Sequence, residues 1–251
     1  KGTSVKCSVP EWHRQLTSTN SVLIERVRAG ESLSDGFILA AHEQTAGRGR
    51  AGRRWFARPG SNLTFSLLLR GPVVFPEVAS LPMAVALGVA TALEALGIDV
   101  QTKWPNDLLV KRRKICGILA ERCATEATVV GLGLNVNMRA DEAAEIDQPA
   151  TSIAIEKGEA YDVQEALGFL LPHIETWIVS WRTRGFAGLQ EAWTQRCVHV
   201  GEYVQVRDGR HKRTGKLLGF GSAGQMLLRE QNGDQREVWV GDLSAETSDE
   251  V

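Results

Sequence analysis

Residues 47–55, with the sequence GRGRAGRRW, concentrate the residue types best suited to bind an anion. Four of these nine residues are arginine and three are glycine, and no acidic residue lies between Gln44 and Glu77. Glycines let the backbone turn tightly and present its N–H groups to a ligand. Arginine offers a planar fork of donors that matches carboxylate and phosphate oxygens. The segment therefore predicts an anion-binding loop, although a solvated basic loop has the same composition.

The same glycines satisfy the G-x-G-x-x-G spacing of a dinucleotide-binding turn, but the following residues do not continue that motif. Such a turn opens a helix and is followed about 20 residues later by an acidic residue. Here residues 62–70 (NLTFSLLLR) predict a strand. The kinase strings H-R-D and D-F-G do not occur in the chain. These observations exclude both common uses of a glycine-rich loop and favour another small anionic ligand.

A second dense segment is KWPNDLLVKRRKICGILAE, residues 103–121. Pro105 imposes a turning or extended backbone, so that Asn106 and Asp107 can project into a cleft. An amide both donates and accepts hydrogen bonds, and a carboxylate can hold Mg²⁺ or orient a lysine. Lys114 ends a basic run and enters an apolar strand, where it can face an anion. The two arginines before it are expected to cover a solvent-exposed hairpin.

A third segment is GLGLNVN, residues 131–137. Gly131 and Gly133 in a strand invite close approach of another backbone or of a flat ligand. Asn135, at the strand end, could read a purine edge. A tightly packed core strand would explain the glycines equally well.

The elements that must position these segments mix helices and strands. Periodicity and capping signals predict helices at 18–30, 77–96, 162–184 and 186–195. Strands are expected at 37–41, 62–70, 99–103, 107–110, 116–121 and 128–136. From Cys197 the chain changes to short alternating strands separated by turn signals such as Asn232-Gly233, which predict a small antiparallel barrel. The pattern is that of an α+β protein with one larger and one small domain.

Composition removes several classes of function. The 251 residues carry a net charge of −1, and few aromatics interleave with the arginines, which disfavours a nucleic-acid binder. The four cysteines lack C-x-x-C spacing and the five histidines are scattered, so neither type forms a metal-binding pattern. No apolar run is expected to span a membrane, and the start has no signal-peptide pattern, which favours a cytoplasmic protein.

Together the three segments, with STN at 18–20 and Gln44, resemble the biotin protein ligases (biotin–[acetyl-CoA-carboxylase] ligase). The motifs occur in the family's order and spacing over residues 18–155, and the resemblance extends weakly to about residue 246. It implies a catalytic domain like those of class II aminoacyl-tRNA synthetases at 1–196, with a mixed sheet and helices. An SH3-like barrel would follow at 197–251. Only seventeen residues precede Ser18, too few for the winged-helix domain of bifunctional members, so the expected type is monofunctional.

The resemblance also implies the reaction and the residues that serve it. The family activates biotin with ATP to biotinyl-5′-AMP and then transfers biotin to one lysine of a biotin carboxyl carrier protein. The implied catalytic residues are Arg48, Arg50 and Lys114. The implied biotin contacts are Ser18, Thr19, Asn20, Gln44, Arg48, Gly49, Arg50, Trp104, Lys114 and Gly117. The implied ATP contacts are Arg48, Arg50, Arg53, Trp55, Asn106, Lys114 and Asn135. Mg²⁺ is expected with ATP, with Asp107 as its candidate ligand.

Two alternatives remain open at this point. A lipoate or octanoate ligase shares the fold, but its RRxSGG-type segment is absent and it does not use KWPND. A biotin-responsive repressor would need a DNA-binding domain upstream of Lys1. The expected partners are biotin, ATP and the carrier protein, with no membrane and no nucleic acid bound by this chain. A homodimer is left open.

The four loop arginines have no acidic neighbour in sequence, and they repel one another. Residues 46–56 are therefore expected to be mobile in the free protein and to become ordered when biotin or the adenylate binds.

Overall fold

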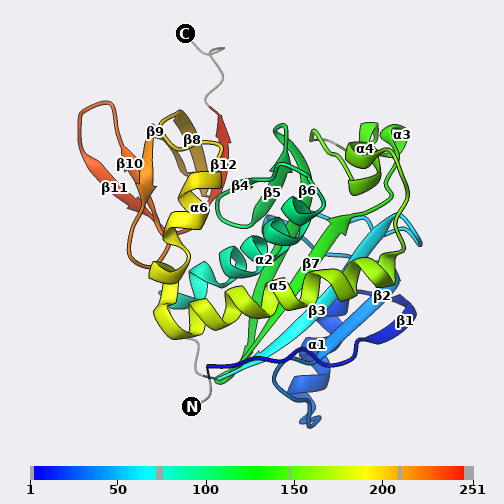
Figure 1. The fold of residues 1–251 in the computed structure, drawn as a ribbon. Helices are drawn as coiled ribbons and strands as arrows, with labels where there is room; N and C mark the ends of the chain where they lie inside the picture. Colours follow the sequence, from blue (N-terminus) through cyan, green and yellow to red (C-terminus); the bar gives the residue numbers. More distant parts are fainter. Residues whose placement is uncertain (1–2, 72–75, 147, 209–210, 246–251) are drawn as a thin grey trace.

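A seven-stranded mixed sheet forms the centre of the molecule (Figure 1). The computed structural model describes all residues except 1–2, 72–75, 147, 209–210 and 246–251. The strands lie in the order β1-β2-β3-β7-β6-β5-β4, and the β1–β2 pair is parallel whereas the other pairs are antiparallel. Their bounds are β1 Glu11–Leu16, β2 Ile38–Gln44, β3 Asn62–Arg70, β4 Gln101–Lys103, β5 Asp107–Val110, β6 Arg113–Ala124 and β7 Ala127–Asn135.

Side chains that alternate along each strand give the sheet two faces, one under α2 and α5 and the other under α1. On β3, Phe65 and Leu67 join the main core beneath α2 (Leu81–Ala95) and α5 (Val163–Arg184), which Figure 1 shows lying across one face of the sheet. Leu68 points the other way and packs with Leu23 of α1 (Thr19–Arg28). Successive strand side chains point to opposite faces, so every second residue of β3, β6 and β7 is available on the α1 face.

The predicted helices are present with small changes at their ends. The Ser18 side chain caps α1 by accepting from Ser21 N, and Pro82 lies in the first turn of α2, as the sequence predicted. The first residues of the expected 77–96 helix form a 3₁₀ turn, Glu77–Ser80. The expected helix at 186–195 is a 3₁₀ turn, Gly185–Gly188, followed by α6, Gln190–Arg196. The sequence did not predict β1 or the short helices α3 (Ala140–Ala144) and α4 (Ile153–Lys157).

A second, five-stranded antiparallel sheet follows α6 in the order β11-β10-β9-β8-β12. Its strands are β8 Tyr203–Asp208, β9 His211–Phe220, β10 Met226–Arg229, β11 Gln235–Val238 and β12 Asp242–Ala245. This matches the small antiparallel unit expected after Cys197. Side chains of both sheets share one buried core, and Trp104 Nε1 donates to Gly224 O across the junction. The boundary between residues 196 and 197 stays a prediction.

One expectation about apolar runs was wrong. Residues 77–95 are long and apolar enough to pass as a membrane span by length and composition. They are mostly buried, however, and α2 packs against α5, β5 and β6, where an apolar helix has partners on several sides. The segment is a core helix.

Replacing glycine by alanine should have opposite effects on the free energy of unfolding at two helix positions. Gly168 of α5 has open space where a Cβ would lie, whereas a Cβ on Gly88 of α2 would come within 2.5 Å of Ile174 Cα on α5. We expect Gly168→Ala to raise the free energy of unfolding by about 0.5–1 kcal/mol through lower backbone entropy. Gly88→Ala should lower it by about 1–3 kcal/mol through overpacking. Urea denaturation measures both, and a stabilised Gly88→Ala variant would contradict the packing described here.

Candidate active site

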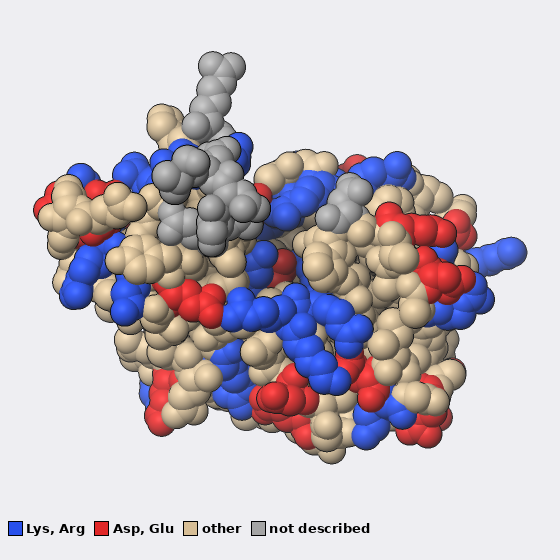
Figure 2. Space-filling view, turned by 90° about the horizontal axis from the view of Figure 1, so that it is seen from above, with Lys and Arg blue, Asp and Glu red and all other residues tan. Residues whose placement is uncertain are grey.

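A cavity of about 710 Å³ opens on the α1 face of the sheet. Figure 2 shows Lys and Arg side chains gathered on the face of the molecule seen from above, with carboxylates beside them. Most of the predicted site residues line this cavity: Ser18, Thr19, Asn20, Gln44, Arg48, Gly49, Arg50, Arg53, Trp55, Asn106, Asp107, Lys114 and Gly117. Residues from five separate segments therefore meet, as the resemblance implied.

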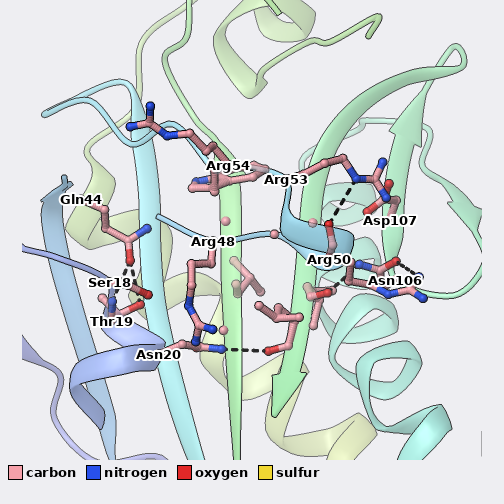
Figure 3. Close-up of a pocket in the computed structure, with 18 of the residues that line it drawn as sticks. Ser18, Thr19, Asn20, Gln44, Arg48, Arg50, Arg53, Arg54, Asn106 and Asp107 are labelled. Atoms are coloured by element: carbon pink, nitrogen blue, oxygen red, sulfur yellow. Dashed lines mark hydrogen bonds between the residues drawn. The ribbon is translucent and has the colours of Figure 1, made fainter. Parts of the chain in front are cut away.

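One end of the cavity is neutral and polar. Gln44 Oε1 accepts from the Thr19 backbone N at 2.7 Å and from Thr19 Oγ1 at 3.2 Å. Ser66 Oγ on β3 lies 2.8 Å from Thr19 Oγ1. Because the Gln44 oxygen is held by Thr19, the amide nitrogen is left to face the cavity, as Figure 3 shows. Ser18 Oγ accepts the cap bond at a long 3.4 Å, which leaves its O–H free to donate to a ligand.

Asn20 lines the cavity beside this neutral end and is held by hydrogen bonds to neighbouring strands. Its Nδ2 donates to Leu119 O at 3.2 Å and to Glu121 Oε2 at 2.8 Å, and its Oδ1 lies 2.6 Å from Ser66 Oγ. A Cβ on Gly131 would come within 2.2 Å of Asn20 Oδ1, so glycine is required there for this close approach. Asn20 therefore joins α1 to β3 and β6 while also lining the cavity.

The arginine loop is folded over the sheet. Gly49 N donates to Arg53 O at 2.7 Å, and Trp55 N donates to Gly47 O at 3.0 Å, which closes the loop on itself. The Trp55 indole lies flat on Gly133, where an added Cβ would be 2.1 Å from the ring. The sequence predicted that another backbone or a flat ligand would approach these glycines, whereas the group on Gly133 is a side chain of the loop.

Three loop arginines find partners that are distant in sequence. Arg48 Nη2 lies 2.6 Å from Glu121 Oε2, and Arg53 Nη2 lies 2.6 Å from Asp242 Oδ1 on β12. Arg50 Nη1 donates to Asn106 Oδ1 at 3.2 Å, and burial lowers the pKa of Arg50. The expectation of mobility assumed arginines without acidic neighbours. That premise was wrong, because the fold supplies Glu121 and Asp242 as partners. The mobility of residues 46–56 in the free protein stays a prediction.

The other end of the cavity carries a buried ion pair. Lys114 Nζ lies 2.8 Å from Asp107 Oδ1, and both side chains are largely buried. Burial also lowers the pKa of nearby Lys103, while the Asp107 charge opposes that shift. Among the described residues no group of three or more His, Cys, Asp or Glu side chains could hold a metal. Asp107 is already committed to a lysine, so the residues do not fit a resident Mg²⁺ site.

A second cavity, of about 720 Å³, adjoins the first and shares Arg54, Trp55, Lys114 and Gln148 with it. Its wall includes Phe56, Met138 and Ile146, so it is suited to a flat, mainly apolar group. Asn135 lines it but is 4% exposed. Its Oδ1 accepts from Asn62 Nδ2 at 2.9 Å, and its Nδ2 donates to Thr151 O at 2.9 Å. The Asn135 amide, which was expected to hydrogen-bond to the edge of a purine, therefore already has protein partners at both its oxygen and its nitrogen.

Trp104 is the predicted site residue that the structure does not bring to either cavity, as far as the described residues show. Its side chain is 3% exposed and packs in the core next to the C-terminal sheet. A Trp-Pro pair between two short strands can point either way, and here the indole fills the core face. Conversely, sequence reasoning missed Glu121 and Gln148: Glu121 binds Arg48, and Gln148 lines both cavities. The one sequence signal for Glu121 was its position as the last residue of the motif CGILAE, residues 116–121.

Gly133→Ala tests the packing of the loop on the sheet. The added methyl group overlaps the Trp55 ring, so the loop must lift. We expect ligand affinity at the cavity to fall by roughly tenfold or more, since displacing one packed aromatic side chain costs about 1–3 kcal/mol. Calorimetric titration with biotin measures the loss. An unchanged affinity would mean that Trp55 does not have to rest on β7.

Comparison with known proteins agrees with this geometry. Residues 12–137 match the model of the Biotin/lipoate A/B protein ligase family. The biotin–[acetyl-CoA-carboxylase] ligase of Paracoccus denitrificans is 34% identical over 233 residues, which cover 88% of this chain and 95% of the relative. The bifunctional ligase/repressor BirA of Bacillus spizizenii is 32% identical over 82% of this chain, and the match spans 65% of that relative's length.

The solved structures agree as well. A biotin protein ligase from Aquifex aeolicus in complex with biotin and ATP superposes with a TM-score of 0.82 at 32% identity, covering 95% of this chain and 99% of that chain. The chain belongs to the biotin/lipoate A/B protein ligase family. Within that family it groups with the biotin protein ligases, and the predicted α+β fold with its C-terminal antiparallel sheet is confirmed.

Proposed function

We propose that this chain activates biotin with ATP to biotinyl-5′-AMP and pyrophosphate, and then transfers biotin to a specific lysine of a biotin carboxyl carrier protein. One observation carries the proposal. Two cavities, one with a neutral polar end and one mainly apolar, meet at four shared residues, Arg54, Trp55, Lys114 and Gln148. A cationic side chain thus lies where the two parts of an acyl-adenylate would join.

Biotin fits the first cavity by its ureido ring, which has both donors and acceptors. The Gln44 amide nitrogen and the Ser18 hydroxyl face that end, and Thr19 holds Gln44 in place. The carboxylate of biotin would then point to the far end, toward Arg50 and Lys114. The adenine base fits the second cavity, against Met138 and Ile146.

Adenylation brings two anions together, the biotin carboxylate and the α-phosphate, which must lie about 3–3.5 Å apart for attack. The carboxylate oxygen attacks phosphorus and pyrophosphate leaves. Cationic side chains that are already in place lower the barrier to adenylation, because they stabilise the negative charge that develops in the transition state without having to reorganise. Arg50 and Lys114 are suited to this role, and Arg53 to the departing phosphates. Arg48 was implied in the same role, and that assignment stays a prediction.

ATP would bring Mg²⁺ as part of the substrate, since the described residues offer no metal cluster of their own. Asp107 then serves to hold Lys114 in position. The carrier protein is the expected acceptor, and we place the reaction in the cytoplasm. A homodimer is compatible with the position of β1 at the end of the sheet. The repressor alternative depends on residues ahead of Lys1.

Pyrophosphate release tests the first half-reaction. Purified protein with MgATP should release pyrophosphate only when biotin is present, and lipoate or octanoate should not replace biotin. Release without biotin would contradict adenylation of biotin, and release with lipoate alone would favour the lipoate-ligase alternative.

A further inference from the structure

The Arg48 side chain is held by the sheet at Glu121 instead of joining Arg50 and Lys114 at the far end of the cavity. Its Nη2 lies 2.6 Å from Glu121 Oε2 on β6. The same carboxylate oxygen accepts from Asn20 Nδ2 at 2.8 Å. Figure 3 shows Arg48 directed toward Asn20 and away from Arg50. The Arg48 guanidinium therefore makes a charge-assisted contact with a carboxylate of the protein itself, at a partly exposed position.

Glu121 is well placed to hold a flexible segment. It lies on a central strand paired with β7, and Asn20 fixes its carboxylate from α1. Arg48, by contrast, lies between Gly47 and Gly49, just after the point where Thr45 N and Ala46 N donate to Leu16 O and Thr17 O. Trp55 on Gly133 fastens the opposite end of the loop. The loop is therefore fastened at both ends, with the backbone of Gly49 lining the cavity between them.

We propose that Glu121 is a positioning residue: by holding Arg48 it keeps the loop closed over the acyl chain and retains biotinyl-5′-AMP until the acceptor lysine arrives. This rests on the proposed function. In this account Arg48 acts through Glu121, and Arg50 and Lys114, not the Arg48 guanidinium, meet the biotin carboxylate.

The two roles of Arg48 predict different double-variant results. If Arg48 acts only through Glu121, then Arg48→Ala, Glu121→Gln and the double variant all remove the same charge-assisted contact, and Glu121→Gln keeps an oxygen that can accept from Asn20. Their effects must then be equal and non-additive. If Arg48 binds the substrate anion directly, its loss slows adenylation and adds to the effect of losing Glu121.

The experiment preforms the enzyme–adenylate complex with biotin and MgATP, and then follows release of labelled biotinyl-5′-AMP during a chase. We expect each single variant and the double variant to release adenylate roughly 3- to 10-fold faster than the unmodified protein, the range for one charge-assisted contact. Their adenylation rate constants should agree with one another within about two-fold. Arg48→Lys, which keeps the charge, should restore part of the retention.

Glu31→Gln is the matched control. It breaks a carboxylate–arginine contact of the same length, 2.6 Å to Arg26, at the far end of α1. Its release rate should equal that of the unmodified protein. Release in Arg48→Ala that matches the control, or additive effects in the double variant, would overturn the proposal.

Trypsin sensitivity supplies a readout that does not need catalysis. Glu121→Gln should be cleaved at the loop arginines faster than Glu31→Gln, because the loop opens more often. Equal cleavage would contradict the proposed contact. Failure of the unmodified protein to form adenylate would count against the proposed function alone, and the cleavage comparison would still decide the role of Glu121.

Discussion

Replacing Lys114 by glutamine is expected to slow the formation of biotinyl-5′-AMP by roughly 10²–10³-fold, the usual effect of losing one preorganised charge at a reacting centre. The affinity for biotin should change far less. Lys114 lies at the junction of the two cavities, and its charge matters most as charge builds on the transferring phosphate. The measurement is single-turnover adenylation together with calorimetric titration of biotin.

The matched control is Lys111→Gln. Lys111 is three residues earlier, its side chain is 76% exposed, and it pairs with Glu156, a largely buried carboxylate that also keeps Arg113 as a partner. It should adenylate biotin at the normal rate. Loss of Lys114 also leaves Asp107 without its partner, so thermal unfolding should be followed in parallel, and Lys114→Gln/Asp107→Asn removes that complication. A variant with a raised KM for biotin and an unchanged kcat would show that Lys114 serves binding alone.

Arg50→Gly is expected to leave some adenylation but to release the adenylate, so that unrelated lysines become biotinylated. A mixed anhydride reacts with any accessible amine, and the enclosure must therefore stay shut until the carrier arrives. Arg50 joins the loop to Asn106 and, at 3.4 Å, to Gly241 O just before β12. Its loss removes charge-assisted contacts worth about 1.5–3 kcal/mol and loosens the loop at its centre.

The assay incubates the variant with biotin, MgATP and an unrelated lysine-rich protein, and then detects biotin on that protein. Arg112→Gly is the control, because Arg112 lies in an exposed hairpin at φ +61°, a conformation that glycine accepts. If Arg50→Gly consumes ATP yet labels the bystander no more than the control does, another residue seals the adenylate. Arg48, held by Glu121, is the next candidate.

Local signals predicted most of the fold correctly. Three of these signals are the Ser18 cap of α1, Pro82 in the first turn of α2 and the apolar run of β3. Each depends only on residues close in sequence, so the sequence alone predicts these three elements. The parallel edge strand β1 was missed because EWHRQL carries no strong strand pattern, and only its pairing with β2 makes it a strand.

The site was harder to predict where a contact joins distant parts of the chain. The glycine spacing correctly indicated a close approach at Gly131 and Gly133, but not that Asn20 and Trp55 would make it. The carboxylates that hold Arg48 and Arg53 lie 73 and 189 residues away in the sequence. Trp104 was assigned to biotin by the family resemblance, and Asn135 to adenine by its type and by the same resemblance, whereas the fold surrounds both with protein partners.

The most direct test of the proposed activity is mass spectrometry of a biotin carboxyl carrier domain incubated with this protein, biotin and MgATP. The account predicts one added biotinyl group on a single lysine, formed only when both biotin and ATP are present. An unmodified carrier domain under conditions in which a known biotin ligase modifies it completely, or labelling spread over many lysines, would contradict the account.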